Sequence, residues 1–137
     1  MRYMLLLKAT ADTESGRMPT DQELTEMGQF NEKLVNAGVM LAGEGLHASA
    51  DGARVDYSGD DRVVTDGPFT ETKELIAGFW IIQAASKEEA VEWARRVPLT
   101  EGQIEVRQVF EDSEFDQSNE YVQKEKVWRQ EQESRGK

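Results

Sequence analysis

Two segments of the chain carry both the start signal and the spacing of an amphipathic helix, and each lies between apolar runs. Thr20 with Glu23, and Ser86 with Glu89, match the capping box, in which a side chain at each position bonds the other's backbone amide. The apolar residues that follow recur at intervals of three and four, so each helix has one face to bury. These apolar positions are Leu24, Met27, Phe30, Leu34 and Ala37 in the first helix, and Ala90, Val91, Ala94 and Val97 in the second.

Four apolar runs predict the strands that cover these two helices: residues 2–8, 39–46, 78–84 and 104–110. Between the second and third runs, Val55 and Tyr57 alternate with polar residues and Val63 follows a turn, which is typical of a small hairpin. Without that hairpin the order is β-α-β-β-α-β. The pattern therefore predicts an α+β two-layer sandwich. Residues 9–18 show no periodicity and predict a loop.

The composition changes after Phe110. Residues 111–120 contain five acidic residues and no basic ones. Tyr121, Glu125 and Trp128 then recur at helical spacing within a highly charged stretch. We therefore expect one domain over residues 1–110, followed over residues 111–137 by an acidic linker and a helical tail.

Charge and composition narrow the classes of function. The 137 residues suit one domain, and the absence of cysteine excludes disulfides, thiolate metal sites and cysteine nucleophiles. The net charge of −11, from 16 basic and 27 acidic residues, argues against nucleic acid or an anionic membrane as partner. The sequence contains no signal peptide and no membrane-spanning run, so we expect the protein to stay in the cytoplasm.

The most distinctive local motif is Asp66-Gly67-Pro68-Phe69. Asp-Gly is a turn signal because glycine permits a positive φ, and proline fixes the φ that follows. A tight turn after the hairpin is therefore one interpretation of the motif. A binding or catalytic loop is the other.

Several spaced motifs, in order along the chain, resemble the DGPF group of YCII-related proteins. They are Gly43 to His47, Asp66 to Phe69, Thr72 to Glu74, Gly78 to Trp80, Glu88 to Ala90 and Ile104 to Arg107. The resemblance runs from residue 1 to about residue 110. It implies a ferredoxin-like fold with the inserted β-hairpin, paired as a homodimer of the dimeric α/β-barrel type, to which the C-terminal helical arm is added.

The resemblance also implies a cleft in which a His and an Asp work as an acid–base pair, at His47 and Asp66 of this sequence. Some relatives are linked to extracytoplasmic-function sigma factors, which implies a regulatory partner of that kind. His47 is the only histidine, so any imidazole chemistry must be its own. A nearby carboxylate such as Asp66 would fix its tautomer, as a general base requires. A structural or merely exposed His47 is the alternative.

Four further residues are candidates for binding a substrate: Glu44, Phe69, Phe79 and Trp80. Glu44 lies on the opposite face from His47 if the strand is regular. The aromatic residues beside an apolar strand can equally belong to the core. The sequence has no pair of histidines spaced to bind a metal, no Gly-x-Ser-x-Gly motif for a serine nucleophile, and no glycine-rich loop for a nucleotide.

These features predict a small-molecule acid–base enzyme of lyase, isomerase or hydrolase type that uses no organic cofactor. His47 would move the proton and Asp66 would orient it. The alternative is a ligand-binding or regulatory module without chemistry, linked to transcriptional control through a sigma factor. A scaffold with a vestigial pocket is a third interpretation.

Overall fold

The computed structural model describes residues 1–135, and its centre is a four-stranded antiparallel sheet of order β2-β5-β1-β6. The strands are β1 (Arg2–Lys8), β2 (Met40–Gly45), β5 (Ile76–Gln83) and β6 (Ile104–Gln108). β1 lies inside the sheet and pairs with both β5 and β6. This order is that of a ferredoxin-like sandwich, so the predicted β-α-β-β-α-β arrangement is confirmed.

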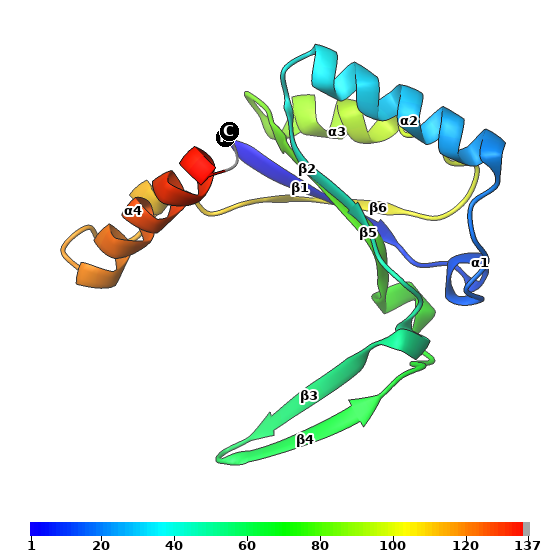
Figure 1. Cartoon of the computed structure of the whole chain (residues 1–137), viewed down its shortest axis with the longest axis horizontal. Helices are drawn as coiled ribbons and strands as arrows, with labels where there is room; N and C mark the ends of the chain where they lie inside the picture. The colour runs from blue at the N-terminus through cyan, green and yellow to red at the C-terminus, as the bar shows by residue number, and fades with distance from the viewer. Residues whose placement is uncertain (136–137) are drawn as a thin grey trace.

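Two helices, α2 (Asp21–Asn36) and α3 (Lys87–Arg95), cover one face of the sheet (Figure 1). Strand side chains alternate between faces, so Tyr3 and Leu5 of β1 point to the helices together with their partners Ile82 and Trp80. Leu34 supplies the facing side chain from α2, and it is fully buried. Burial of a leucine side chain contributes about 1.5–3 kcal/mol to folding. Phe30 and Leu34 of α2 and Ala90 of α3 are buried here, whereas Leu24, at the start of the predicted stripe, is exposed.

The opposite face of the sheet is apolar, and within residues 1–135 neither α2 nor α3 covers it. Met4 and Leu6 of β1 pair with Ile81 and Phe79 of β5, and all four side chains are only half-buried. Figure 1 shows two projections on this side of the sheet, the hairpin and the C-terminal helix. We call this surface the open face.

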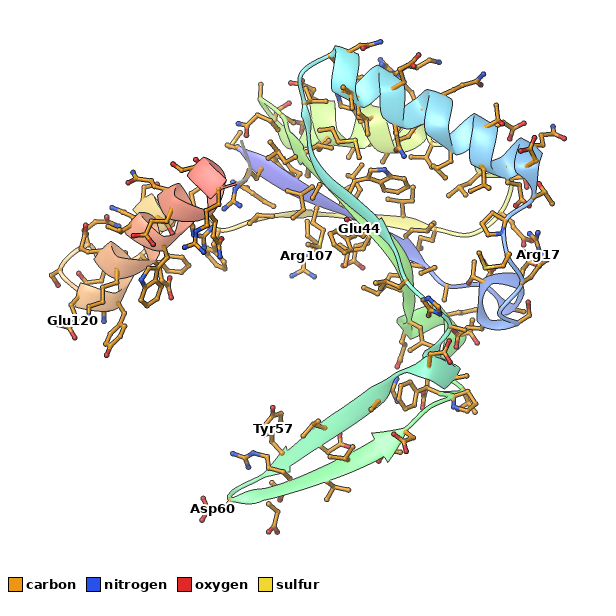
Figure 2. The ribbon with its side chains drawn as sticks, in the orientation of Figure 1. Arg17, Glu44, Tyr57, Asp60, Arg107 and Glu120 are labelled. Atoms are coloured by element: carbon orange, nitrogen blue, oxygen red, sulfur yellow. The ribbon has the colours of Figure 1, made fainter. Side chains whose placement is uncertain are left out.

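The predicted hairpin consists of β3 (Ala53–Ser58) and β4 (Asp61–Asp66), joined through Gly59 at a φ of 58°. It extends away from the sheet, with Tyr57 and Asp60 near its far end (Figure 2). Apolar side chains are exposed along it, namely Val55, Tyr57, Val63 and Val64. An isolated two-stranded hairpin is only marginally stable in water, so these side chains need a further surface against which to pack.

The segment predicted as a loop contains a short helix, α1 (Ala11–Glu14), and the prediction for residues 9–18 is wrong at that point. Thr10 and Thr13 form a reciprocal cap, in which each hydroxyl accepts the other's backbone N–H. A single turn is too short to show the periodicity by which helices are recognised. Only the cap itself was present as a signal.

The C-terminal tail forms α4 (Glu120–Arg135), as expected from the spacing of Tyr121 and Trp128; residues 136–137 of the predicted tail lie outside the described residues. No side chain of α4 is buried. The start of the tail is attached to β1, because Glu111 accepts hydrogen bonds from Arg2 Nε at 3.1 and 3.3 Å. Among the described residues, no helix has the length and apolar character needed to cross a membrane.

The start of α2 carries a compact ionic cluster. Arg17, labelled in Figure 2, donates to Asp12 at 2.7 Å and to Glu23 at 2.9 Å. Thr20 and Glu23 form the predicted capping box. The guanidinium of Arg17, with help from the amide of Thr20, lowers the pKa of Glu23 from 4.5 to about 2.

We expect the charge of Glu23 to stabilise the fold above pH 4.5 and this contribution to fade as the pH falls toward 2, because the folded-state pKa is the lower one. Glu23→Gln removes the charge yet keeps a residue that can complete the capping box. Urea unfolding midpoints of both proteins should differ most near neutral pH and converge in acid. Glu26→Gln is the matched control on the same helix. A gap that stays constant with pH would contradict the assignment.

Candidate functional site

His47 lies directly after β2, in the connection to the 3-10 helix η1 (Ser49–Asp51). Its Nδ1 is 3.1 Å from Oδ2 of Asp51, one turn further along the chain. The side chains are 87% and 67% exposed in the single chain. The imidazole is therefore oriented by a carboxylate but is not enclosed.

The carboxylate beside His47 is not the one that the sequence suggested. Asp66 ends β4 and pairs with Ala53 at the base of the hairpin. Within residues 1–135, no hydrogen bond or ion pair joins Asp66 to His47. The resemblance points to Asp66 through the Asp-Gly-Pro-Phe motif and carries no signal for Asp51. The spacing of His47 and Asp51 by four residues was the available signal.

A junction of three segments lies next to His47. Glu14 of α1 accepts two hydrogen bonds from Ser49, one from its hydroxyl and one from its amide at 2.9 Å. The same hydroxyl accepts the backbone N–H of Phe69 at 2.9 Å. The junction therefore ties α1, η1 and the Asp-Gly-Pro-Phe loop together. Sequence analysis could not find it, since Glu14 and Ser49 are 35 positions apart and carry no motif.

The surroundings of Gly67 explain why the loop has a glycine at this position, and the reason is not the positive φ that the sequence suggested. Its φ is not positive, and the bond from Gly67 to Pro68 is cis. Its Cα instead faces the backbone of η1 so closely that a Cβ would lie 1.7 Å from the carbonyl oxygen of Ser49. The amide of Gly67 also donates to Gly52 at 3.0 Å. Close approach of two backbones is thus the constraint.

Phe69, a predicted binding residue, is packed against a charged pair. The guanidinium of Arg54 lies 3.8 Å above the centre of its ring and also contacts Glu71 at 3.3 Å. The pKa of Glu71 is lowered by a backbone hydrogen bond and by Arg54. The stack fastens the Asp-Gly-Pro-Phe loop to the first strand of the hairpin.

The other three candidates lie on the central sheet. Trp80 belongs to the core: it is 6% exposed, its ring meets that of Phe30 edge-on, and its Nε1 donates to Asn31 at 2.9 Å. Phe79 lies on the open face, directly opposite Glu44 of β2. The burial of Trp80 favours the packing role that the sequence left open, whereas Phe79 is half-buried and Glu44 is exposed.

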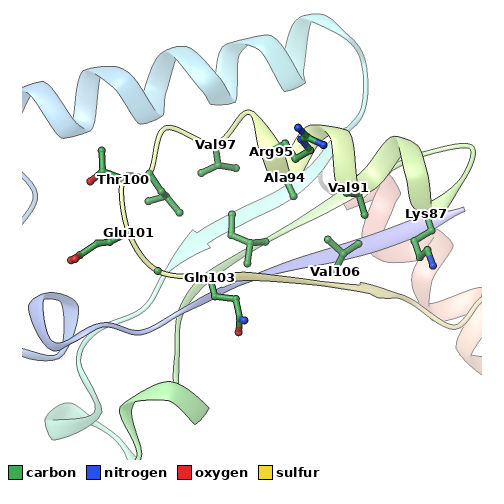
Figure 3. Close-up of a pocket in the computed structure, with 12 residues that line it drawn as sticks. Lys87, Val91, Ala94, Arg95, Val97, Thr100, Glu101, Gln103 and Val106 are labelled. Carbon is green, nitrogen blue, oxygen red and sulfur yellow. The ribbon is translucent and has the colours of Figure 1, made fainter.

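Neither of two concavities formed by residues 1–135 has His47 or Asp66 in its lining. One is a groove of about 640 Å³ between α3 and β6, where Val91, Ala94 and Val97 look toward Val106 (Figure 3). The other is a cavity of about 510 Å³ beside the end of β1. In the described part of the chain, no three His, Asp or Glu side chains come together as a metal site would require.

We expect Gly67→Ala to lower the free energy of unfolding by about 1–3 kcal/mol, because the added methyl must displace the backbone of η1. Gly45→Ala is the control, since nothing lies within 4 Å of a Cβ there, and its effect should stay within about 0.5 kcal/mol. Urea denaturation measures both. Equal stabilities of the two variants would show that the approach to Ser49 is not tight.

Comparison with known proteins places the chain in a family. A model of the YCII-related domain matches residues 1–113. An uncharacterised protein of Rhizobium meliloti (strain 1021) is 34% identical over 91 residues, which are 64% of this chain and 73% of that protein. A solved structure of 5-chloro-2-hydroxyhydroquinone dehydrochlorinase from Burkholderia phenoliruptrix AC1100, in complex with 2,5-dihydroxybenzoquinone, aligns with a TM-score of 0.46 and 16% identity, over 85% of this chain and 100% of that one. On the strength of the family model, which spans most of its length, the chain belongs to the YCII-related family.

Proposed function

We propose that this protein is a homodimeric enzyme that moves a proton on a small polar or aromatic molecule, with His47 as the acid–base group and no organic cofactor. The observation that carries the proposal is the hydrogen bond between His47 and Asp51 at 3.1 Å. Asp66, at the end of β4 and the base of the hairpin, is a second carboxylate, and an experiment below tests its part in the site.

The proposed chemistry follows from which hydrogen bonds the side chains of His47 and Asp51 can donate and accept. An ionised carboxylate only accepts hydrogen bonds, so the hydrogen between His47 and Asp51 must be carried by Nδ1. The lone pair of Nε2 is then free to take a proton from a carbon or hydroxyl group of the substrate. The imidazolium formed is stabilised by Asp51 and returns the proton to the product.

Exposure of His47 is the weak point of a single chain as a catalyst, because a general base works best where water is excluded. A second copy would supply cover. The open face is apolar around Leu6 and Phe79, and the hairpin exposes Tyr57 and Val64. A symmetric dimer would bury both surfaces at once.

We expect a homodimer of about twice 15.5 kDa by light scattering at micromolar concentration. Phe79→Glu places a charge on the open face and should yield monomers. Val35→Glu makes the same change at a position on α2 that is 61% exposed, and it should leave the dimer intact. A wild-type protein that scatters as a monomer, or a Phe79→Glu variant that stays dimeric, would contradict the proposed pairing.

Proton transfer is testable before the natural substrate is known, because a base that deprotonates a carbon acid also exchanges its hydrogen with D₂O. We expect a member of a panel of small oxo and hydroxy acids and phenols to exchange faster with the protein present. His47→Gln should slow that exchange by about 100-fold or more. Undiminished exchange in the folded His47→Gln protein would rule out His47 as the base.

The two carboxylates are distinguished by the tautomer of His47, which the chemical shifts of its two ring nitrogens report directly. Asp51→Asn should change the balance of tautomers and slow the exchange, whereas Asp66→Asn should change neither. The reverse result would restore the pair predicted from the sequence. No other imidazole contributes to the spectrum, since the chain has a single histidine.

A ligand-binding or regulatory module is the alternative, and the 87% exposure of the His47 side chain favours it. Such a module, including one that acts through a sigma factor, would bind without exchanging protons. Saturable binding of a panel compound with no exchange, and with no effect of His47→Gln on affinity, would establish that class.

A further inference from the structure

The cavity of about 510 Å³ beside the end of β1 has a positively charged lining, although the net charge of the chain is negative. Its lining comes from three segments: the end of β1 and the start of α1, the 3-10 helix η2 (Thr72–Glu74), and the turn before β6. Two lysines, Lys8 and Lys73, line it, and none of the other described residues in its lining is acidic. In a chain with 27 acidic and 16 basic residues, such a local excess of positive charge is selective for anions.

Lys8 is a sheltered cation with incomplete compensation. Its side chain is only 19% exposed. Among the described residues its one ionic neighbour is Glu105, at 3.7 Å from Nζ, beyond hydrogen-bonding distance. Glu105 is also held by Arg107 at 3.2 Å, so two cations share one carboxylate. An ammonium group has three hydrogens to donate, and a sheltered one that is poorly paired favours binding of an anion.

Lys73 adds a second positive charge to the lining of the cavity. Within residues 1–135 it forms no ion pair. Thr10, Thr72 and Gln103 also line the cavity, and their hydroxyl and amide groups are neutral groups able to orient a ligand. The remaining wall is small and apolar, from Ala9, Ala11 and Gly102. The volume falls within the range of small-molecule sites.

We propose that this cavity binds a small organic carboxylate, with Lys8 and Lys73 holding the anionic group and the alanine wall receiving an apolar body of up to one aromatic ring. The apolar wall distinguishes an organic acid from a bare inorganic anion. Binding needs neither His47 nor the proton transfer proposed above, so it stands or falls independently of that function.

The test is to titrate the full chain with benzoate, with its neutral analogue benzamide, and with inorganic phosphate. NMR and calorimetry monitor the binding. Benzoate should saturate with a dissociation constant at or below about 1 mM, a modest demand for a ligand of this size. It should perturb the amides of Thr10, Thr72 and Gly102. Benzamide should bind at least about tenfold more weakly, since it lacks the charge.

Lys73→Met should weaken benzoate binding at least about tenfold. Lys73 is exposed, so this variant should fold even where Lys8→Met does not. Lys87→Met is the matched control, because it removes the same charge from the groove beside α3. The proposal would be overturned by equal affinities for benzoate and benzamide, or by equal effects of Lys73→Met and Lys87→Met. It would also be overturned if only phosphate gave saturable binding, or if no compound did.

Discussion

The carboxylate of Glu14 holds together the end of the molecule that carries His47, through its two hydrogen bonds to Ser49. The hairpin extends from the sheet on two connections, one through η1 and one through the Asp-Gly-Pro-Phe loop. Ser49 joins the first connection to α1 and, by accepting the amide of Phe69, joins the second to the first. A sheltered carboxylate with two donors is a strong tie, since hydrogen bonds to charged groups contribute about 1.5–3 kcal/mol each. The positions of His47 and Asp51 on η1 and its approach depend on it.

Elements with a repeating signal were predictable from the sequence, and elements fixed by a single contact were not. The capping box at Thr20 and the apolar stripe that includes Phe30 and Leu34 define α2. The order of elements follows because two apolar helix faces require a sheet to cover them. The four residues of α1 are too few for a periodic pattern. The role of Gly67 was predicted as a turn with positive φ, whereas the structure has it facing the carbonyl of Ser49. Only tertiary contact reveals such a constraint.

The candidate site shows the same division. The sequence singled out His47 and, through resemblance, the Asp-Gly-Pro-Phe motif, and the structure brings both to the base of one hairpin. Which carboxylate orients the imidazole depends on where η1 turns, and the spacing to Asp51 carried that information only weakly. Trp80 was ambiguous because an aromatic residue on an apolar strand suits a pocket or a core equally. Its alternation with Phe79 resolves the matter physically, since neighbouring residues of a strand face opposite sides of the sheet.

The helix α1 lies between the cationic cavity and the junction beside His47. Ala11, at its start, lines the cavity, and Glu14, at its end, holds Ser49. One turn of helix has little stability of its own. Its order therefore derives from the cap between Thr10 and Thr13 and from the bonds of Glu14. An anion placed against Thr10 and Ala11 would add contacts to the same turn. Because a bound ligand favours the conformation that it contacts, such a ligand would couple occupancy of the cavity to order at the junction. Such coupling would act through the stability of this one turn of helix and would not require the sheet to move.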